Sequence, residues 1–164
     1  MKNGKINFKV LKVFLLIFVC SFLVAFATPS ENVISYHYKN MGFLENEKAY
    51  VVFENKDDLY YYLEKFPSNK KTTEMKEELS KFNDEYFNEN VLILANVSAK
   101  SSSISYYITD MSFEKGKLTI SLTSKAPIRV NQDMANWNIF IEYKKLVFKE
   151  INIIKDGINI SQKY

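Results

Sequence analysis

Residues 91–97 read Val-Leu-Ile-Leu-Ala-Asn-Val, a nearly continuous apolar run near the middle of the chain. A short run of this kind between polar segments is typical of a buried strand, so we expect a central strand here. On its C-terminal side, apolar and polar residues alternate with a period of two in several further segments. Because two is the period of a β-strand, residues 91–97 predict the centre of a β-sheet.

Two hairpins are predicted in the C-terminal half. Residues 114–117 form a short polar loop between two alternating segments, and Gly116 can supply the positive φ that such loops need. Asp156-Gly157 is a turn dipeptide between apolar runs at residues 151–154 and 158–160. In the first hairpin, four residues of the leading strand are expected to share one face: Tyr107, Thr109, Met111 and Phe113.

The N-terminal half contains two segments with helical periodicity. Asn55 can cap the first helix, which is expected to end at Pro67, and Thr72 or Thr73 can cap the second. The buried faces are expected to contain Leu59, Tyr62, Leu63 and Phe66 in the first helix, and Met75, Leu79 and Phe82 in the second. Residues 34–38 and 49–53 are strand-like and precede these helices.

This order of elements predicts the fold class. Strands, two helices and then a series of strands indicate an α+β fold, mainly an antiparallel β-sheet or sandwich with two short helices. The chain has 164 residues, of which 47% are hydrophobic and 15% aromatic, a composition that supports one packed domain.

A signal peptide or hydrophobic helix is expected before this domain. Lysines precede an apolar run at residues 13–26, and Ala25-Phe26-Ala27 presents small residues where a signal peptidase cuts. The run is shorter than the roughly 20 residues that span a bilayer as a helix. We therefore expect a signal peptide over residues 1–27, with an uncleaved membrane anchor as the alternative.

The mature domain, residues 28–164, is accordingly expected outside the cell or on its surface. Membrane contact is expected only through the N-terminal segment, if it is uncleaved. Because the leader contains four lysines and no acidic residue, its removal changes the formal charge from +3 to about −1. Nucleic acid is therefore not an expected partner.

Few residue types for catalysis or metal binding remain in the mature chain. Cys20 is the only cysteine and lies in the leader, and His37 is the only histidine. We therefore expect no enzyme activity, no metal and no cofactor. A weak hydrolase, in which His37 would activate a serine of residues 98–105, is the alternative from catalytic chemistry.

An ordered series of features extends from about residue 51 to residue 145. It comprises a helix ending in Phe66-Pro67, the segment Phe82-Asn83-Asp84-Glu85-Tyr86-Phe87, the strand Val91-Leu92-Ile93-Leu94-Ala95, a small-residue loop, the strand Ser105-Tyr106-Tyr107-Ile108, the hairpin at Gly116 and a loop with Pro127 before an aromatic strand. This series resembles the PrcB C-terminal domain family, named for an accessory subunit of an extracellular protease complex. The resemblance implies a secreted protein that binds another protein, such as a secreted protease.

Candidate contact residues lie in one helix and two loops. Tyr60 and Tyr61 accompany the buried Tyr62, and one of the two is expected to point outward. Loops 98–103 and 125–136 add four further candidates, Ser101, Ser102, Ser103 and Arg129, and Trp137 is a fifth if it is not part of the core. A cell-wall or carbohydrate-binding module, in which exposed tyrosines and Trp137 stack on sugars, is the alternative binding function.

Overall fold

The computed structural model describes residues 33–39 and 49–161 of the chain. Three short helices and eight strands make this part α+β and mainly β, which confirms the predicted fold class. Within the described residues, no helix is long and apolar enough to span a membrane. The expected signal peptide, residues 1–27, lies outside the described residues and stays a prediction.

Strand β3 (Asn90–Ala99) is a central strand, as residues 91–97 predict. It lies between β6 (Ala135–Lys144) and β2 (Tyr50–Phe53), and β1 (Ser35–Lys39) pairs with the other side of β6. All three pairings of this sheet, called sheet A, are antiparallel. Every residue from 91 to 97 is buried, because both faces of sheet A are covered.

The remaining described strands form sheet B, in the order β4 (Ser105–Glu114), β5 (Lys117–Lys125), β7 (Glu150–Lys155) and β8 (Ile158–Asn159). β5 and β7 run parallel, while the other described pairs are antiparallel. The parallel pair arises because β6, which follows β5 along the chain, belongs to sheet A. The chain therefore reverses direction twice before β7 begins.

Both predicted hairpins are confirmed, and their turns have the expected backbone. Lys115 and Gly116 have φ values of 52° and 85° between β4 and β5, and Asp156 and Gly157 have values of 49° and 81° between β7 and β8. Two successive residues with positive φ are typical of the type I′ turns that match the twist of paired strands. Glycine takes such a φ without the steric cost that other residues meet.

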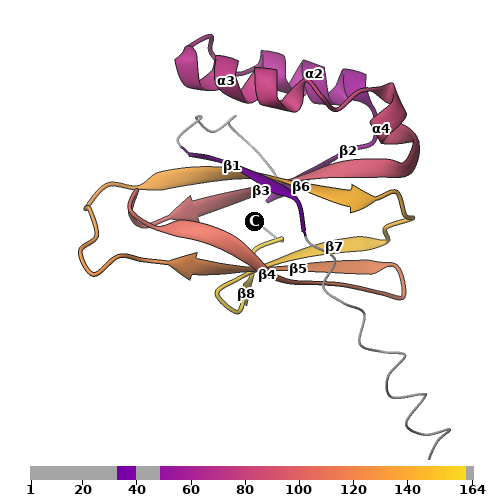
Figure 1. Ribbon diagram of the computed structural model, residues 1–164. Helices are drawn as coiled ribbons and strands as arrows, with labels where there is room; N and C mark the ends of the chain where they lie inside the picture. Colours follow the sequence, from indigo (N-terminus) through magenta and orange to yellow (C-terminus); the bar gives the residue numbers. More distant parts are fainter. Residues whose placement is uncertain (1–32, 40–48, 162–164) are drawn as a thin grey trace, which may run out of the picture. The chain divides into compact units, whose positions relative to one another are not determined.

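Sheet A separates two hydrophobic cores (Figure 1). Successive residues of a strand point to opposite faces, so Ile93 packs between the two sheets and Leu94 packs against the helices. The core between the sheets includes Val91, Ile93, Val97, Leu118, Ile120, Leu122, Ile139, Ile141, Ile151 and Ile153. The core between sheet A and the helices includes Phe53, Leu59, Tyr62, Leu63, Phe66, Met75, Leu79, Phe82, Leu92, Leu94 and Phe140.

The two predicted helices are α2 (Lys56–Glu64) and α3 (Lys70–Leu79). All the residues predicted for their buried faces are buried, but α2 ends before the expected Pro67, and Phe66 and Phe82 lie just after the two helices. The Asn55 side chain caps α2 by accepting a hydrogen bond from the Asp58 backbone N–H at 2.8 Å. The predicted cap of α3 is wrong. Asn69 caps this helix, and Thr72 lies three residues inside it, where its hydroxyl completes a capping box by accepting from the Asn69 N–H.

A third helix, α4 (Asp84–Glu89), joins α3 to β3 and was not expected. Its cap is Asn83, whose side chain accepts a hydrogen bond from the Tyr86 N–H at 3.0 Å. The helix has six residues, too few for helical periodicity to stand out in the sequence. Phe87 is its buried residue, and it packs in the core beneath the helices.

The expectation that four alternate residues of β4 share one face is wrong. The pairing of β4 with β5 shifts register between Ile108 and Asp110. Before this β-bulge, Ile108 packs against the core between the sheets and Tyr107 is exposed; after it, Met111 packs against that core. A bulge adds one residue to one strand and so reverses the alternation of faces beyond it.

Candidate functional site

One end of the sandwich, which we call the loop end, is formed by residues 100–104, residues 126–134 and the turn at residues 156–157. Ala99 pairs with Ala135 in sheet A, and Ser105 pairs with Lys125 in sheet B. The β3–β4 loop and the β5–β6 loop therefore leave neighbouring strand ends. The two loops in which the sequence places contact residues are thus brought together at one end.

The serines of the β3–β4 loop hold the β5–β6 loop in place. The Ser103 hydroxyl accepts a hydrogen bond from the Asn131 N–H at 3.2 Å, and the Ser102 N–H donates to the Asp133 carbonyl at 2.9 Å. Ser101 and Ser102 are buried, with exposed fractions of 2% and 9%. Ser102 and Ser103 therefore hold the neighbouring loop, whereas the Ser101 hydroxyl accepts a hydrogen bond from the Ser103 N–H within its own loop.

The β5–β6 loop exposes apolar side chains. Ile128 is fully exposed, and the exposed fractions of Val130 and Met134 are 53% and 76%. Arg129, the only arginine of the chain, lies between Ile128 and Val130 and is exposed as well. Exposing such side chains to water is unfavourable, and their grouping on one loop that is tied to the fold is typical of a contact surface.

Trp137 lies at the start of β6 and contributes to the fold. Its indole N–H donates to the Ile104 carbonyl at 3.0 Å, and its ring packs against the core between the sheets. This contact fixes residue 104 of the β3–β4 loop to sheet A. Trp137 is thus a support of the loop end.

The two tyrosine candidates lie on α2, in the helix layer. Tyr61 points outward, with an exposed fraction of 67%, and the Lys65 ammonium lies 4.5 Å from the centroid of its ring. Tyr60 is half-buried, and its hydroxyl donates to the Ser80 carbonyl at 3.3 Å. Tyr61 is therefore the outward residue of the pair.

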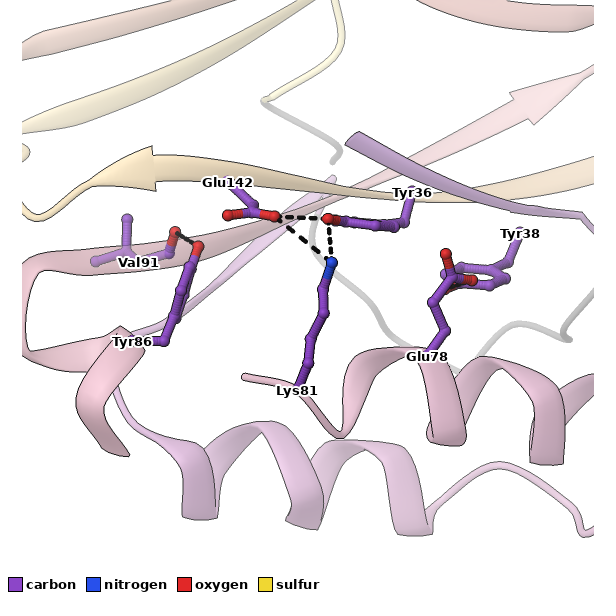
Figure 2. Close-up of polar contacts among 7 residues, drawn as sticks. All are labelled: Tyr36, Tyr38, Glu78, Lys81, Tyr86, Val91 and Glu142. Carbon is purple, nitrogen blue, oxygen red and sulfur yellow. Dashed lines mark hydrogen bonds and ion pairs between the residues drawn. The ribbon is translucent and has the colours of Figure 1, made fainter. Parts of the chain in front are cut away.

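A cluster of tyrosines and charged residues links the helix layer to the edge of sheet A, and the sequence analysis did not anticipate it (Figure 2). The Tyr36 hydroxyl donates to the Glu142 carboxylate at 2.6 Å and accepts from the Lys81 ammonium, which lies 3.9 Å from the same carboxylate. The Tyr38 hydroxyl donates to Glu78 at 2.6 Å. Residues 36 and 142 meet only through the pairing of β1 with β6, so no local sequence signal brings them together.

The electrostatics of this cluster do not favour catalysis by tyrosine. Burial raises the pKa of Tyr36 and Tyr38 well above the ordinary value, and the carboxylates of Glu142 and Glu78, respectively, raise it further. Burial also raises the pKa of Tyr86, whose hydroxyl donates to the Val91 carbonyl. A phenol with a raised pKa stays protonated and is a poor base or nucleophile. Tyr38 and Tyr86 donate hydrogen bonds between the helix layer and sheet A, whereas Tyr36 donates within sheet A.

His37 lies on β1 with its side chain on the face opposite to Tyr36 and Tyr38. Its Nε2 atom is 2.9 Å from the Ser35 hydroxyl, two residues earlier on the same strand. Ser101, Ser102 and Ser103, three of the serines among residues 98–105 that the hydrolase alternative would use, form hydrogen bonds at the loop end. The structure offers no observation that favours the hydrolase alternative.

Burial lowers the pKa of His37, and a pH dependence of stability is expected from it. In the unfolded chain the histidine has its ordinary pKa of about 6.5, so it takes up a proton at a higher pH than in the folded protein. The contribution of the neutral His37 to the free energy of unfolding is therefore complete above about pH 6.5. This contribution is lost as the pH falls below this value, because the unfolded chain then binds the proton first. Urea unfolding between about pH 7.5 and pH 5.5 should show a smaller loss of stability in His37→Gln than in the parent protein. Equal losses in both proteins would contradict this role.

A metal site is not found within the part of the chain that the structure describes. No group of three or more His, Cys, Asp or Glu side chains there is arranged to hold a metal ion. Comparisons of the chain with models of protein families, with curated proteins and with solved structures give no match. The resemblance to the PrcB C-terminal domain family therefore stays a prediction.

The sequence analysis selected Arg129 in the β5–β6 loop but missed the apolar residues beside it. Ile128, Val130 and Met134 are apolar residues in a segment that is otherwise polar and contains Pro127. These apolar residues do not recur with the spacing of a strand or a helix. Because they do not form one side of such an element, they are expected to be exposed. This signal could have identified the surface.

Proposed function

We propose that this domain is a secreted or cell-surface protein-binding module whose contact surface is the β5–β6 loop. The observation that carries the proposal is the exposure of Ile128, Val130 and Met134 on one loop whose base is hydrogen-bonded to Ser102 and Ser103. A loop that is held in one conformation loses less conformational entropy on binding. Exposed apolar side chains on such a loop suit insertion into a partner.

The position of the loop within the sandwich supports this proposal. The Glu142 N–H donates to the Ile34 carbonyl at 3.0 Å, so the described chain begins beside the C-terminal end of β6. The loop precedes the N-terminal end of this strand, ten residues away. At about 3.3 Å per residue, the two ends are about 30 Å apart. The first described residues therefore leave the loop accessible to a partner.

The partner class is part of the proposal. Another protein is the expected partner, and the resemblance implies an extracellular protease or a component of its complex. The carbohydrate-binding alternative used Trp137 as a stacking platform, but the Trp137 ring packs against the core between the sheets. No observation favours that alternative over protein binding.

Serine substitutions in the loop are expected to abolish most of the binding. We would express the full chain with a C-terminal tag in the organism that produces it and cross-link it in intact cells. Burying one such apolar side chain contributes about 1.5–3 kcal/mol, so Ile128→Ser, Val130→Ser and Met134→Ser together should lower partner recovery at least tenfold.

Val147→Ser is the matched control, because it removes an aliphatic side chain, 86% exposed, from another connection of the chain. Its partner recovery should equal that of the parent protein. Circular dichroism and urea unfolding would show that each variant folds. Undiminished recovery of the same partner by the triple variant would refute the proposed surface.

A further inference from the structure

The longest sheet edge in the described part of the chain is the outer side of β4. In sheet B, β4 pairs with β5 on one side, and no described strand pairs with its other side. β4 has ten residues, whereas the other strands that end a sheet, β1, β2 and β8, have five, four and two. A long edge of this kind is a template on which a further strand can pair.

The hydrogen bonds of β5 show which backbone groups of β4 point to this edge. The Leu122 carbonyl accepts from the Asp156 N–H at 2.9 Å, and the Ser124 N–H donates to the Asp156 carboxylate at 2.7 Å. These groups of β5 therefore point away from β4, and with a period of two so do those of Leu118 and Ile120. Their partners across the antiparallel ladder direct their own N–H and C=O groups to the outer edge, and these partners are Tyr106, Ile108, Met111 and Phe113.

The side chains of these four residues anchor the edge. Tyr106 is buried, and Ile108 and Met111 pack against the core between the sheets. The ring centroid of Phe113 lies 6.0 Å from that of Phe148. The β-bulge after Ile108 bends the strand but leaves two edge-directed residues on each side of it. β4 contains no lysine or proline, the residues that often protect an edge from pairing.

We infer that the β4 edge binds an extended segment of the protein partner, which adds to sheet B as a further strand. This inference rests on the proposed function and adds the way in which the partner chain is recognised. In this mode, main-chain hydrogen bonds supply the affinity and alternate side chains supply the specificity. Ser105 at the start of β4 pairs with Lys125, directly before the β5–β6 loop, so one partner can contact the edge and the loop together.

The charges of β4 indicate which strand fits this edge. Asp110 and Glu114 are its charged residues, and Asp110 is exposed. Asp110 pairs with Ser121 of β5, where its diagonal neighbours are Thr119 and Thr123, so no basic residue of β5 lies beside it. A lysine or arginine opposite Asp110 is therefore expected in the partner strand. A second copy of β4 would bring two more acidic residues and no base, which disfavours self-pairing.

Amide hydrogen exchange of the full chain, measured by NMR, tests the state of the edge. In the protein alone, the four edge-directed amides should exchange fast, whereas those of Tyr107 and Ser112, which face β5, should exchange slowly. Slow exchange of the edge amides at every protein concentration would show that a segment of the same chain covers the edge. Slow exchange that appears only as the concentration rises would show a second copy there. Either result would overturn the inference.

Peptides selected from a phage-displayed random library against the immobilised full chain supply the added strand. Bound peptides should slow the exchange of Tyr106 with Ile108, of Met111 with Phe113, or of all four, about tenfold or more. N-methylation of one alternate set of peptide amides should abolish binding, whereas N-methylation of the other set should not.

The charge on the edge is tested with the same peptides, which are expected to contain lysine or arginine. Asp110→Lys should weaken their binding about threefold or more, because an attraction is replaced by a repulsion between neighbouring strands. Glu64→Lys is the matched control, since it makes the same change of charge at an exposed position of α2, and it should leave binding unchanged.

The outcomes separate this inference from the proposed function. Peptides that leave the edge amides in fast exchange, but lose binding to the Ile128, Val130 and Met134 serine variant, would overturn the added strand and leave the loop as the contact surface. Peptides that slow the edge amides and bind the serine variant as tightly as the parent protein would support the added strand and exclude the loop. A library that gives peptides of neither kind would overturn both proposals.

Discussion

Replacing Phe140 by alanine is expected to destabilise the domain by about 3–5 kcal/mol. Phe140 is fully buried in the core between sheet A and the helices. Its ring centroid lies 5.9 Å from that of Tyr38 and 6.3 Å from that of Phe53. Truncation removes these contacts and leaves a cavity that neighbours on two paired strands cannot easily fill. Urea unfolding at neutral pH would measure the loss.

The control for this substitution is Tyr61→Ala, which truncates an exposed aromatic side chain on α2. This substitution should change the free energy of unfolding by no more than about 0.5 kcal/mol, as at most surface positions. If Phe140→Ala were no more destabilising than this control, the helices would not form a common core with sheet A. The slope of unfolding against urea should be the same for both variants, since the surface exposed on unfolding is unchanged.

Much of the fold could be predicted from local patterns. The apolar run at residues 91–97 identified a strand buried on both faces, and the turns at Gly116 and Gly157 identified the hairpins. These signals are local because burial period and positive φ are properties of short segments. Helical spacing likewise placed the buried faces of α2 and α3.

The features that were missed depend on tertiary pairing or on competition between nearby groups. Asn69 competes with Thr72 and Thr73 for the cap of α3, and both residue types, Asn and Thr, are good caps. The bulge after Ile108 leaves no periodic signal before the strand is paired. β5 and β7 are parallel because β6, which lies between them in the sequence, pairs in sheet A, and this tertiary pairing leaves no local signal in the sequence.

The candidate site was predicted at the level of loops but not of side chains. Ser101 and Ser102 are buried where exposure was expected, because Ser102 is hydrogen-bonded to the neighbouring loop and the Ser101 hydroxyl accepts from the Ser103 N–H of its own loop. Arg129 is exposed, and its neighbour Ile128 is more notable because nothing within the described fold covers it. A small polar residue in a loop can either support the loop through hydrogen bonds or contact a partner. The amino-acid sequence alone does not distinguish these two roles.

Replacing Glu142 by alanine is expected to cost about 1.5–3 kcal/mol, the range for hydrogen bonds to charged groups. Its carboxylate accepts from Tyr36 and lies near the Lys81 ammonium, so removal leaves a half-buried phenol and an ammonium without their shared acceptor. The hydrogen bonds from Tyr38 to Glu78 and from Lys81 to Tyr36 would still join the two layers at this edge. Urea unfolding of the parent and variant proteins would measure the difference.

Glu89→Ala supplies the matched control, because Glu89 also pairs with a lysine, Lys144, but both side chains are largely exposed. Exposed pairs contribute about 0–1 kcal/mol, so this substitution should cost less. A double-mutant cycle with Tyr36→Phe separates the hydrogen bond from the other contacts of Glu142. Coupling of about 1 kcal/mol or more is expected between residues 36 and 142. Independent effects of the two substitutions would show that the hydrogen bond between Tyr36 and Glu142 does not stabilise the fold.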